Sequence, residues 1–217
     1  MSLKATLQAK LALGLAEMGL QLDEAKQAKL IDYVLLIDKW NKVHNLTAIR
    51  DPLEMVTLHL LDSLSVLPHV QSLAPKTLLD VGAGAGLPSI PLAICLPELQ
   101  VTAIDAVQKK ASFMRQVKGE LGLANFQVKA GRVEALEKDS LQINKFDVIV
   151  SRAFSEISLF LELTKHLLAD GGKWLAMKGA VPTHEFEKSQ IQPTEIKVLK
   201  VAGLDAERHL IVLQPTK

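Results

Sequence analysis

Cysteine and aromatic residues are scarce in this sequence. Among its 217 residues there is one cysteine, Cys95, and only 4% are aromatic. A single cysteine excludes an internal disulfide and is typical of a protein from a reducing compartment, so we expect a cytoplasmic location. Because Cys95 lies in an apolar run, we predict that it packs in the hydrophobic core.

Charge of one sign is not in excess either. The chain carries 25 Lys and Arg residues against 24 Asp and Glu residues, which gives a formal net charge of +1. This balance excludes a strongly basic overall field of the kind that attracts nucleic acid. Any contact with RNA must therefore come from a local patch.

Long apolar runs without interruption are also missing. The longest uncharged run, residues 81–97, contains three glycines and three prolines, which argues against a membrane-spanning helix. Near the N-terminus, leucines recur every four residues, but Lys10 and Glu17 interrupt them. This pattern predicts an amphipathic helix and not a signal peptide. We expect no membrane contact.

Two kinds of pattern divide the chain. Residues 1–75 show helical periodicity: Asp23 can cap a second helix, and a third is expected from Asp51 through Leu64, with a proline in its first turn. Since 48% of the residues are hydrophobic, the chain can bury a full core. We predict a helical N-terminal extension (1–75) and an α/β domain (76–217) that pack as one compact unit.

The second segment alternates short β-like runs with helical ones. Strands are expected at residues 77–81, 100–105, 125–130, 146–150 and 173–177. Helices are expected at residues 88–96, 108–121, 132–136 and 156–168. This alternation predicts a doubly wound, mostly parallel sheet with helices on both faces. Residues 195–201 and 209–214 are expected to close the sheet as an antiparallel pair.

A glycine-rich turn follows the first expected strand. The segment LLDVGAGAGLPSIPLA, residues 78–93, carries Gly82, Gly84 and Gly86. In a doubly wound sheet, ligands bind beyond the carboxyl ends of the strands, where glycines allow close approach to main-chain N–H groups. The spacing G-x-G-x-G is neither the dinucleotide fingerprint G-x-G-x-x-G nor a phosphate-binding loop. It counts against a nucleotide-dependent oxidoreductase, the rival enzyme class.

Two acidic residues accompany these glycines. Asp80 lies two residues before Gly82, and Asp105 ends the second expected strand. The combination resembles class I S-adenosylmethionine-dependent methyltransferases, whose Rossmann-like fold holds the methionine end of the cofactor at the glycine turn and its ribose at the second acid. A carboxylate suits the ribose hydroxyls because it only accepts hydrogen bonds. The alternatives are an ordinary glycine turn and an Asp105 that caps a helix.

Seven segments narrow the resemblance to one family. Between Trp40 and Val212 the chain contains, in order, WNKVHNLTAIRD, HLLDSL, the glycine segment, GRVEAL, VSRAF, MKG and ERHLIV. They resemble the bacterial 16S ribosomal RNA guanine-N7 methyltransferases, the glucose-inhibited division protein B family. The resemblance implies methyl transfer from S-adenosyl-L-methionine to N7 of one guanine in the decoding-region loop. The implied partner is 16S rRNA or the small ribosomal subunit, and we expect a monomer.

The resemblance also implies a cofactor site. The implied cofactor-binding residues are Gly82, Leu87, Val133, Glu134 and Arg152, to which the general class I pattern adds Asp105, Gly84 and Gly86. The guanidinium of Arg152 could hold a carboxylate or a phosphate. The alternative for Arg152 is a surface ion pair with Glu156.

Several polar and basic side chains are candidates for contact with RNA or with the target base. They are Asn45, Arg50, His59, Asp62, Lys109, Lys110 and Arg132. For His59 and Asp62, three residues apart on a helix, the alternative is that they pair with each other. For the lysines and Arg132 we weigh a basic rim that neutralises phosphates against an ordinary solvated face.

The implied reaction needs no general base. Guanine N7 carries an in-plane lone pair and no proton, so the main requirements are alignment with the methyl group and exclusion of water. The candidates for a catalytic contact are Arg152, Asn45 and His59, and no metal is expected. From outside the enzymes, the alternative is an RNA-binding ribosome-assembly factor that keeps the cofactor pocket without turnover.

Overall fold

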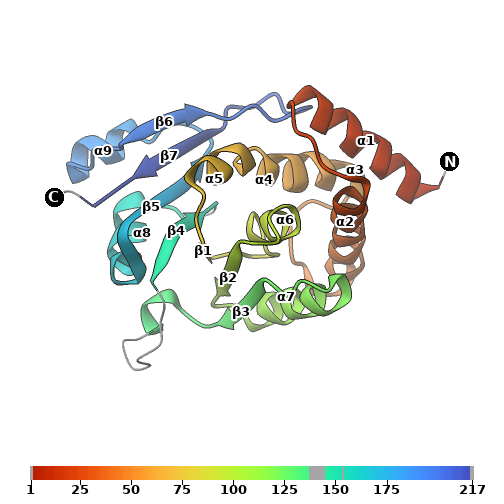
Figure 1. Ribbon diagram of the computed structural model, residues 1–217, viewed down its shortest axis with the longest axis horizontal. Coiled ribbons are helices and arrows are strands. Elements are labelled where there is room, and N and C mark those ends of the chain that lie inside the picture. Colours follow the sequence, from red (N-terminus) through yellow and green to blue (C-terminus); the bar gives the residue numbers. More distant parts are fainter. Residues whose placement is uncertain (1, 137–144, 153, 216–217) are drawn as a thin grey trace.

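One seven-stranded sheet forms the centre of the protein (Figure 1). The computed structural model describes residues 2–136, 145–152 and 154–215. The strands follow the order β3-β2-β1-β4-β5-β7-β6. They are β1 (Thr77–Val81), β2 (Gln100–Asp105), β3 (Phe126–Ala130), β4 (Phe146–Ser151), β5 (Leu168–Lys178), β6 (Glu195–Val198) and β7 (His209–Leu213). The first five strands of this order, from β3 through β2, β1 and β4 to β5, are parallel to one another. Strand β7 is antiparallel to both of its neighbours, β5 and β6. The predicted doubly wound α/β fold is confirmed.

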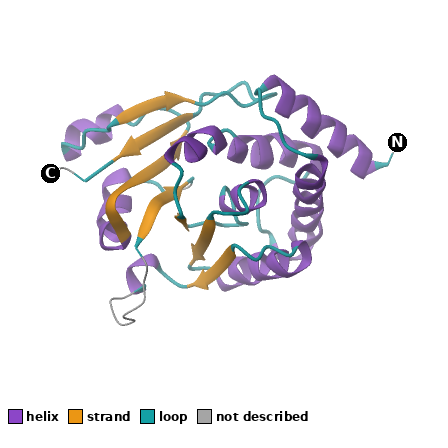
Figure 2. Ribbon diagram, viewed as in Figure 1, coloured by secondary structure: helices purple, strands orange, loops and turns teal. Residues whose placement is uncertain are grey.

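Helices cover both faces of the sheet (Figure 2). Alternate residues of a strand point to opposite faces, and both faces are apolar: Leu78 belongs to one buried cluster and Leu79 to another. The larger cluster includes Ala93 and Phe113 and the smaller one includes Phe160. These residues lie on helices α6 (Ser89–Cys95), α7 (Gln108–Leu121) and α8 (Ile157–Thr164).

The N-terminal segment is helical, as predicted. Its elements are α1 (Leu3–Glu17), α2 (Glu24–His44), α3 (Pro52–Met55), the π-helical η1 (Val56–Leu61), α4 (Asp62–Leu64) and α5 (Leu67–Leu73). The side chain of Asp23 caps α2 by accepting a hydrogen bond from the Lys26 N–H. The continuous run of α3, η1 and α4 corresponds to the expected third helix.

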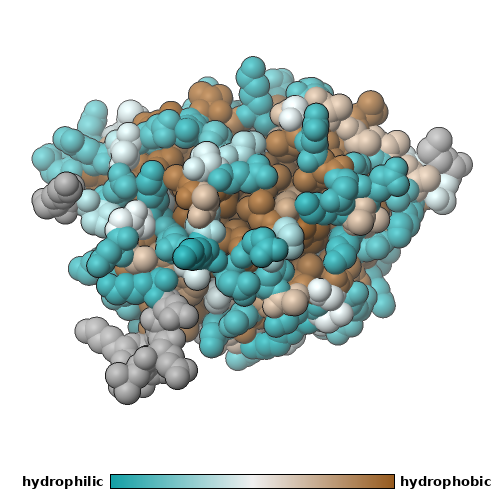
Figure 3. Space-filling view, in the orientation of Figure 1, coloured by the Kyte–Doolittle hydropathy of each residue, from teal (hydrophilic) through white to brown (hydrophobic). Residues whose placement is uncertain are grey.

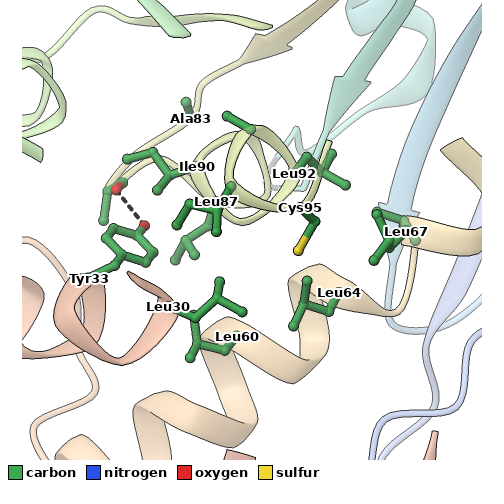
Figure 4. Close-up of a cluster of buried hydrophobic side chains, with 14 of the residues drawn as sticks. Leu30, Tyr33, Leu60, Leu64, Leu67, Ala83, Leu87, Ile90, Leu92 and Cys95 are labelled. Carbon is green, nitrogen blue, oxygen red and sulfur yellow. Dashed lines mark hydrogen bonds between the residues drawn. The ribbon is translucent and has the colours of Figure 1, made fainter. Parts of the chain in front are cut away.

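This segment shares its core with the sheet domain. One buried cluster contains Leu7 from α1 together with residues of α2 and α6. Figure 4 shows Leu30 of α2 with Leu92 and Cys95 of α6 in this cluster. The hydroxyl of Tyr33 donates a hydrogen bond of 2.7 Å to the carbonyl of Ala85, inside the glycine turn. Helix α2 therefore contacts the turn directly.

Some elements differ from the prediction. Helix α9 (Thr183–Ser189) has no buried residue, so no apolar periodicity indicated it. Strand β5 starts at Leu168 because that residue pairs with Phe146, and the expected helix at 156–168 is therefore shorter and ends in the 3₁₀ turn η3 (Lys165–Leu167). The helix expected at 132–136 is the single 3₁₀ turn η2 (Val133–Ala135).

The surface agrees with the balanced composition. Hydrophilic residues lie over much of the face seen in Figure 3, with apolar residues between them. In the described part of the chain, no helix combines the length and the apolar character needed to cross a membrane.

Candidate active site

The three glycines of the turn have left-handed backbones but different surroundings. Gly82, Gly84 and Gly86 have φ values of 70°, 63° and 93°. A Cβ added at Gly86 would lie 2.3 Å from Cδ1 of Ile90, whereas one added at Gly82 or Gly84 would meet no heavy atom within 4 Å. Gly86 is therefore needed for packing against α6. Gly82 and Gly84 border open space that a ligand can enter.

A cavity of about 240 Å³, which we call the glycine-turn cavity, lies beside this turn. It is lined by Val81, Gly82, Ile104, Asp105, Ala106, Gly131, Arg132, Val133, Glu134, Phe154, Leu159 and Leu163. These residues follow or end β1, β2, β3 and β4, or lie on α8. The tertiary structure thus brings together Gly82, Asp105, Val133 and Glu134, four of the residues that the sequence indicated for a cofactor.

Asp105 ties the turn to the next strand. Its Oδ2 accepts a hydrogen bond of 2.8 Å from the Gly84 N–H, and its Oδ1 accepts one of 2.8 Å from the Val107 N–H at the start of α7. A carboxylate has about four acceptor positions, so these two bonds leave capacity for ribose hydroxyls. Asp105 thus binds the main chain of Val107, the N-cap residue of α7, and its contact with a ribose stays a prediction.

Asp80 lies beneath the turn. It is fully buried, and its Oδ2 accepts a hydrogen bond of 3.1 Å from the N–H of Ser89 at the start of α6. Burial raises the pKa of Asp80 to about 7, although the Ser89 contacts oppose the shift. Leu87 is also buried, with its side chain in the core cluster shown in Figure 4. Its contact with a cofactor stays a prediction.

A second cavity, of about 420 Å³, is lined by three of the other candidates, His59, Asp62 and Arg152. We call it the arginine cavity; it is lined by Ile49, Leu58, His59, Asp62, Arg152, Met177, Lys178, Gly179 and Arg208. Its centre is Asp62, whose side chain is only 6% exposed. Nη1 of Arg152 lies 3.0 Å from Asp62 Oδ2, and Nε of Arg208 lies 2.8 Å from Asp62 Oδ1.

These contacts differ from the two pairs that the sequence offered as alternatives, His59 with Asp62 and Arg152 with Glu156. Asp62 pairs with the two arginines and not with His59, whose Nε2 lies 3.0 Å from the hydroxyl of Thr47. Arg152 pairs with Asp62, and its Nη1 also donates to the Leu58 carbonyl at 3.2 Å. Neither the His59–Asp62 pair nor the Arg152–Glu156 pair is among the ion pairs and hydrogen bonds of the described residues.

His59 is neutral near physiological pH. Burial, followed by the charge of Arg152, lowers its pKa to about 4. The helical run that carries His59 brings this buried residue into the lining of the arginine cavity. The ring therefore contributes shape and hydrogen bonding to the arginine cavity, and no charge.

The remaining candidates lie outside the arginine cavity. Asn45 ends α2 in a left-handed conformation, and its Oδ1 accepts a hydrogen bond of 2.8 Å from Nη2 of Arg50. Both side chains are exposed. Lys109 is exposed in the first turn of α7 and Lys110 is partly buried beside it. Nε of Arg132 forms an exposed ion pair of 3.1 Å with Glu134 at the rim of the glycine-turn cavity.

Three residues that line the arginine cavity or bind one of its lining residues were not singled out from the sequence. Arg208 contacts Asp62, Thr47 contacts His59, and Nζ of Lys178 donates to the carbonyls of Phe154 and Ser155 at 2.7 and 3.0 Å. The segments ERHLIV, WNKVHNLTAIRD and MKG contain these residues. Their presence in those segments was the available signal, although it does not reveal which partners they contact.

Comparison with known proteins identifies the family. The model of the family "GidB: rRNA small subunit methyltransferase G" matches residues 26–211. The chain belongs to this family. It is 59% identical to the Ribosomal RNA small subunit methyltransferase G of Methylobacillus flagellatus, over 95% of this chain and 98% of that protein. It is 52% identical to the protein of the same name from Aromatoleum aromaticum, over 95% and 98%.

Solved structures agree on the fold of this GidB-family protein. An O-methyltransferase from Bacillus cereus, solved in complex with SAH, has a TM-score of 0.60 at 17% identity and covers 95% of this chain and 98% of its own. A putative O-methyltransferase from Klebsiella pneumoniae also has a TM-score of 0.60, at 14% identity, over 95% and 97% of the two chains. At such low identity these likenesses bear on the fold alone.

The glycine-turn cavity fits the cofactor of a GidB-family methyltransferase, S-adenosyl-L-methionine. The open space at Gly82 and Gly84 permits close approach to the backbone. Asp105 has acceptor capacity for hydroxyl groups, and Phe154 and Leu159 provide apolar walls of the kind that cover an adenine ring. The bound cofactor would supply an electrophilic methyl group on a positively charged sulfur.

Proposed function

We propose that this protein transfers the methyl group of S-adenosyl-L-methionine to N7 of one guanine in the decoding-region loop of 16S ribosomal RNA. The observation that carries the proposal is the family match over residues 26–211. Relatives that bear the rRNA methyltransferase name are aligned over nearly their whole length. The proposed partner is 16S rRNA or the small ribosomal subunit, and the proposed state is a cytoplasmic monomer.

Within this function we assign the cofactor to the glycine-turn cavity. Gly82, Asp105, Val133 and Glu134 all line it. Gly84 and Gly86 shape the turn, Leu87 follows it in the chain, and Arg152 lies just after β4 in the arginine cavity. We further propose that the extension (1–75) and the domain (76–217) work as one compact unit, since one buried cluster draws residues from both.

The geometry suits a reaction that needs alignment and no base. Guanine N7 attacks with an unprotonated lone pair, so the protein has to orient the base and exclude water. His59 is neutral and already bonded to Thr47. Asp62 is held by two arginines, one on each of its carboxylate oxygens. Two of the three catalytic candidates, Arg152 and His59, line the arginine cavity. The third, Asn45, binds Arg50 in the loop between α2 and α3.

Transfer of labelled methyl tests the proposal. The substrate is small-subunit RNA from cells that lack this enzyme, offered as naked RNA and as subunits, and the product is mapped by cleavage at 7-methylguanine. One labelled guanine in the decoding-region loop is the expected result. Binding of S-adenosylhomocysteine without transfer to any RNA would instead favour the alternative of a ribosome-assembly factor. Label elsewhere in the RNA would correct the site.

The rate of the chemical step should be nearly independent of pH. Between about pH 6.5 and 9, His59 stays neutral because its pKa lies far below this range. Single-turnover methyl transfer should therefore give the same flat profile in the natural protein and in His59→Gln. The cofactor must be saturating, because Asp80 has a pKa of about 7 and its charge attracts a cationic cofactor only in the upper part of the range. A rising limb that vanishes in His59→Gln would make His59 a general base and contradict N7 attack.

The basic rim should contribute to RNA affinity and not to cofactor affinity. Lys109, Lys110 and Arg132 follow the ends of β2 and β3 at the carboxyl edge of the sheet. Replacing all three by Gln should raise the KM for RNA and reduce its log–log dependence on salt by about 0.7–0.9 per lost phosphate contact. Arg50→Gln tests the loop after α2 in the same assay. An unchanged salt slope in the triple variant would make these residues an ordinary solvated face.

A further inference from the structure

The arginine cavity carries more positive charge than its one carboxylate balances. Arg152, Arg208 and Lys178 line it together with Asp62, and His59 is neutral. The side chains of Arg152 and Arg208 are about a quarter exposed, at 24% and 27%, whereas that of Asp62 is 6% exposed. Asp62 therefore lies behind the arginines, and the cationic groups face the cavity.

Both arginines keep hydrogen-bond donors for a ligand. A guanidinium has five N–H groups. Among the described residues, Arg152 uses its Nη1, toward Asp62 and Leu58, and Arg208 uses its Nε and Nη1, toward Asp62 and the Glu207 carbonyl. The Nη2 groups are left over. Because Asp62 binds one arginine on each oxygen, it holds both guanidiniums in fixed positions.

The rest of the lining suits a base. Ile49, Leu58 and Met177 are apolar walls of the same cavity, and a volume of about 420 Å³ lies within the range of small-molecule sites. A lining that combines positive charge with apolar side chains matches the two halves of a nucleotide, its phosphate and its base. The target base of an enzyme that modifies a nucleotide is commonly extruded into such a pocket.

The position relative to the glycine-turn cavity also fits. Arg152 lines one cavity, and Phe154, two residues later, lines the other. The hydroxyl of Ser151 donates a hydrogen bond of 2.9 Å to the Val81 carbonyl, which joins the ends of β4 and β1 between the cavities. Lys178 holds this loop by its bonds to the Phe154 and Ser155 carbonyls. The two cavities therefore border the same short segment that follows β4.

We propose that the arginine cavity binds the target guanosine nucleotide, with Arg208 contacting its phosphate and Asp62 positioning both arginines. This inference rests on the proposed function and names the place of its substrate. The phosphate takes the guanidinium because N7 of the guanine has to stay free for methylation. Arg208 is the informative residue, since it lies in the loop before β7 and does not line the glycine-turn cavity.

The test compares guanosine 5′-monophosphate with guanosine as inhibitors of RNA methylation. In the natural protein the monophosphate should inhibit about 10-fold or more strongly than the nucleoside, the ratio expected for a charged hydrogen bond. In Arg208→Gln this ratio should fall to near one, and Arg208→Lys should retain part of it. Lys165→Gln is the matched control: it removes one exposed positive charge at the opposite edge of the sheet, before β5, and should leave the ratio unchanged.

A second measurement separates binding from a structural role. Arg208→Gln should raise the KM for RNA about 10-fold and reduce its salt slope by about 0.7–0.9, with affinity for S-adenosylhomocysteine within twofold of the natural value. Merely loosened packing would not change the salt slope. The proposal is overturned if the inhibition ratio is the same in Arg208→Gln and the natural protein, or if the monophosphate does not inhibit at its solubility limit. If N7 methylation persists in either case, only this assignment fails; if the natural protein methylates no guanine N7, the proposed function fails as well.

Discussion

A Gly82→Asn variant should bind S-adenosylhomocysteine about 100-fold more weakly than the natural protein, a loss of about 2.7 kcal/mol. Gly82 lines the glycine-turn cavity, and an added Cβ there would meet no heavy atom within 4 Å. The new side chain would therefore enter the space reserved for the cofactor. Asparagine is a suitable replacement because it tolerates the left-handed backbone better than other residues. Titration calorimetry measures the affinity, and circular dichroism checks the fold.

Gly19→Asn is the matched control for this variant. Gly19 has a φ of 68°, close to the 70° of Gly82, and an added Cβ would again meet nothing within 4 Å. It follows α1, away from both cavities. Both variants should show a similar small loss of thermal stability, and only Gly82→Asn should lose the cofactor. Full affinity in a folded Gly82→Asn would remove the glycine turn from the cofactor site.

An Asp62→Ala variant should lower the free energy of unfolding by about 3 kcal/mol, the low end for breaking a buried ion pair. Among the described residues that line the arginine cavity, Asp62 is the only one with a carboxylate, and its loss leaves Arg152 and Arg208 without this counter-charge. The low end applies because both arginine side chains are about a quarter exposed and can recover some hydration. Urea denaturation, followed by circular dichroism, gives the value.

Asp32→Ala provides the comparison for Asp62. Asp32 forms an ion pair of 2.5 Å with Lys4, but the two side chains are 42% and 47% exposed. Exposed pairs of this kind contribute about 0–1 kcal/mol. Equal losses in the two variants would show that burial of Asp62 does not make its contacts more important. The predicted larger loss of stability in Asp62→Ala would show that the contacts of Asp62 with Arg152 and Arg208 help to hold the N-terminal helices at the edge of the sheet.

Much of the architecture was predictable because it depends on local patterns. The bounds of β1, β2 and α7 agree with the expected ranges, since both faces of the sheet are apolar and α7 has a clear apolar face with Phe113 and Val117 buried. Helix α9 could not be found in this way, because none of its residues is buried. The start of β5 depends on its pairing with β4, which is not visible in either segment alone.

That four of the proposed cofactor residues line one cavity was predictable for a related reason. Gly82, Asp105, Val133 and Glu134 each follow or end a parallel strand, and the carboxyl ends of such strands meet at one edge of a doubly wound sheet. Spacing along the chain therefore indicates proximity in space. The different roles of the glycines were not predictable, because only the position of Ile90 shows that Gly86 serves packing while Gly82 borders open space.

The sequence by itself determined the family, the order of the elements and the glycine turn at the end of β1. Only the tertiary structure decided the partners of Asp62, which lie 90 and 146 residues away in the chain. From the sequence, His59 was one of the possible partners, because residues three apart on a helix are neighbours. The structure turns Asp62 toward the carboxyl edge of the sheet, where Arg152 and Arg208 arrive from separate loops. A buried carboxylate is stable only beside groups that offset its lost hydration, and which cations can reach it depends on how the N-terminal helices pack against the sheet.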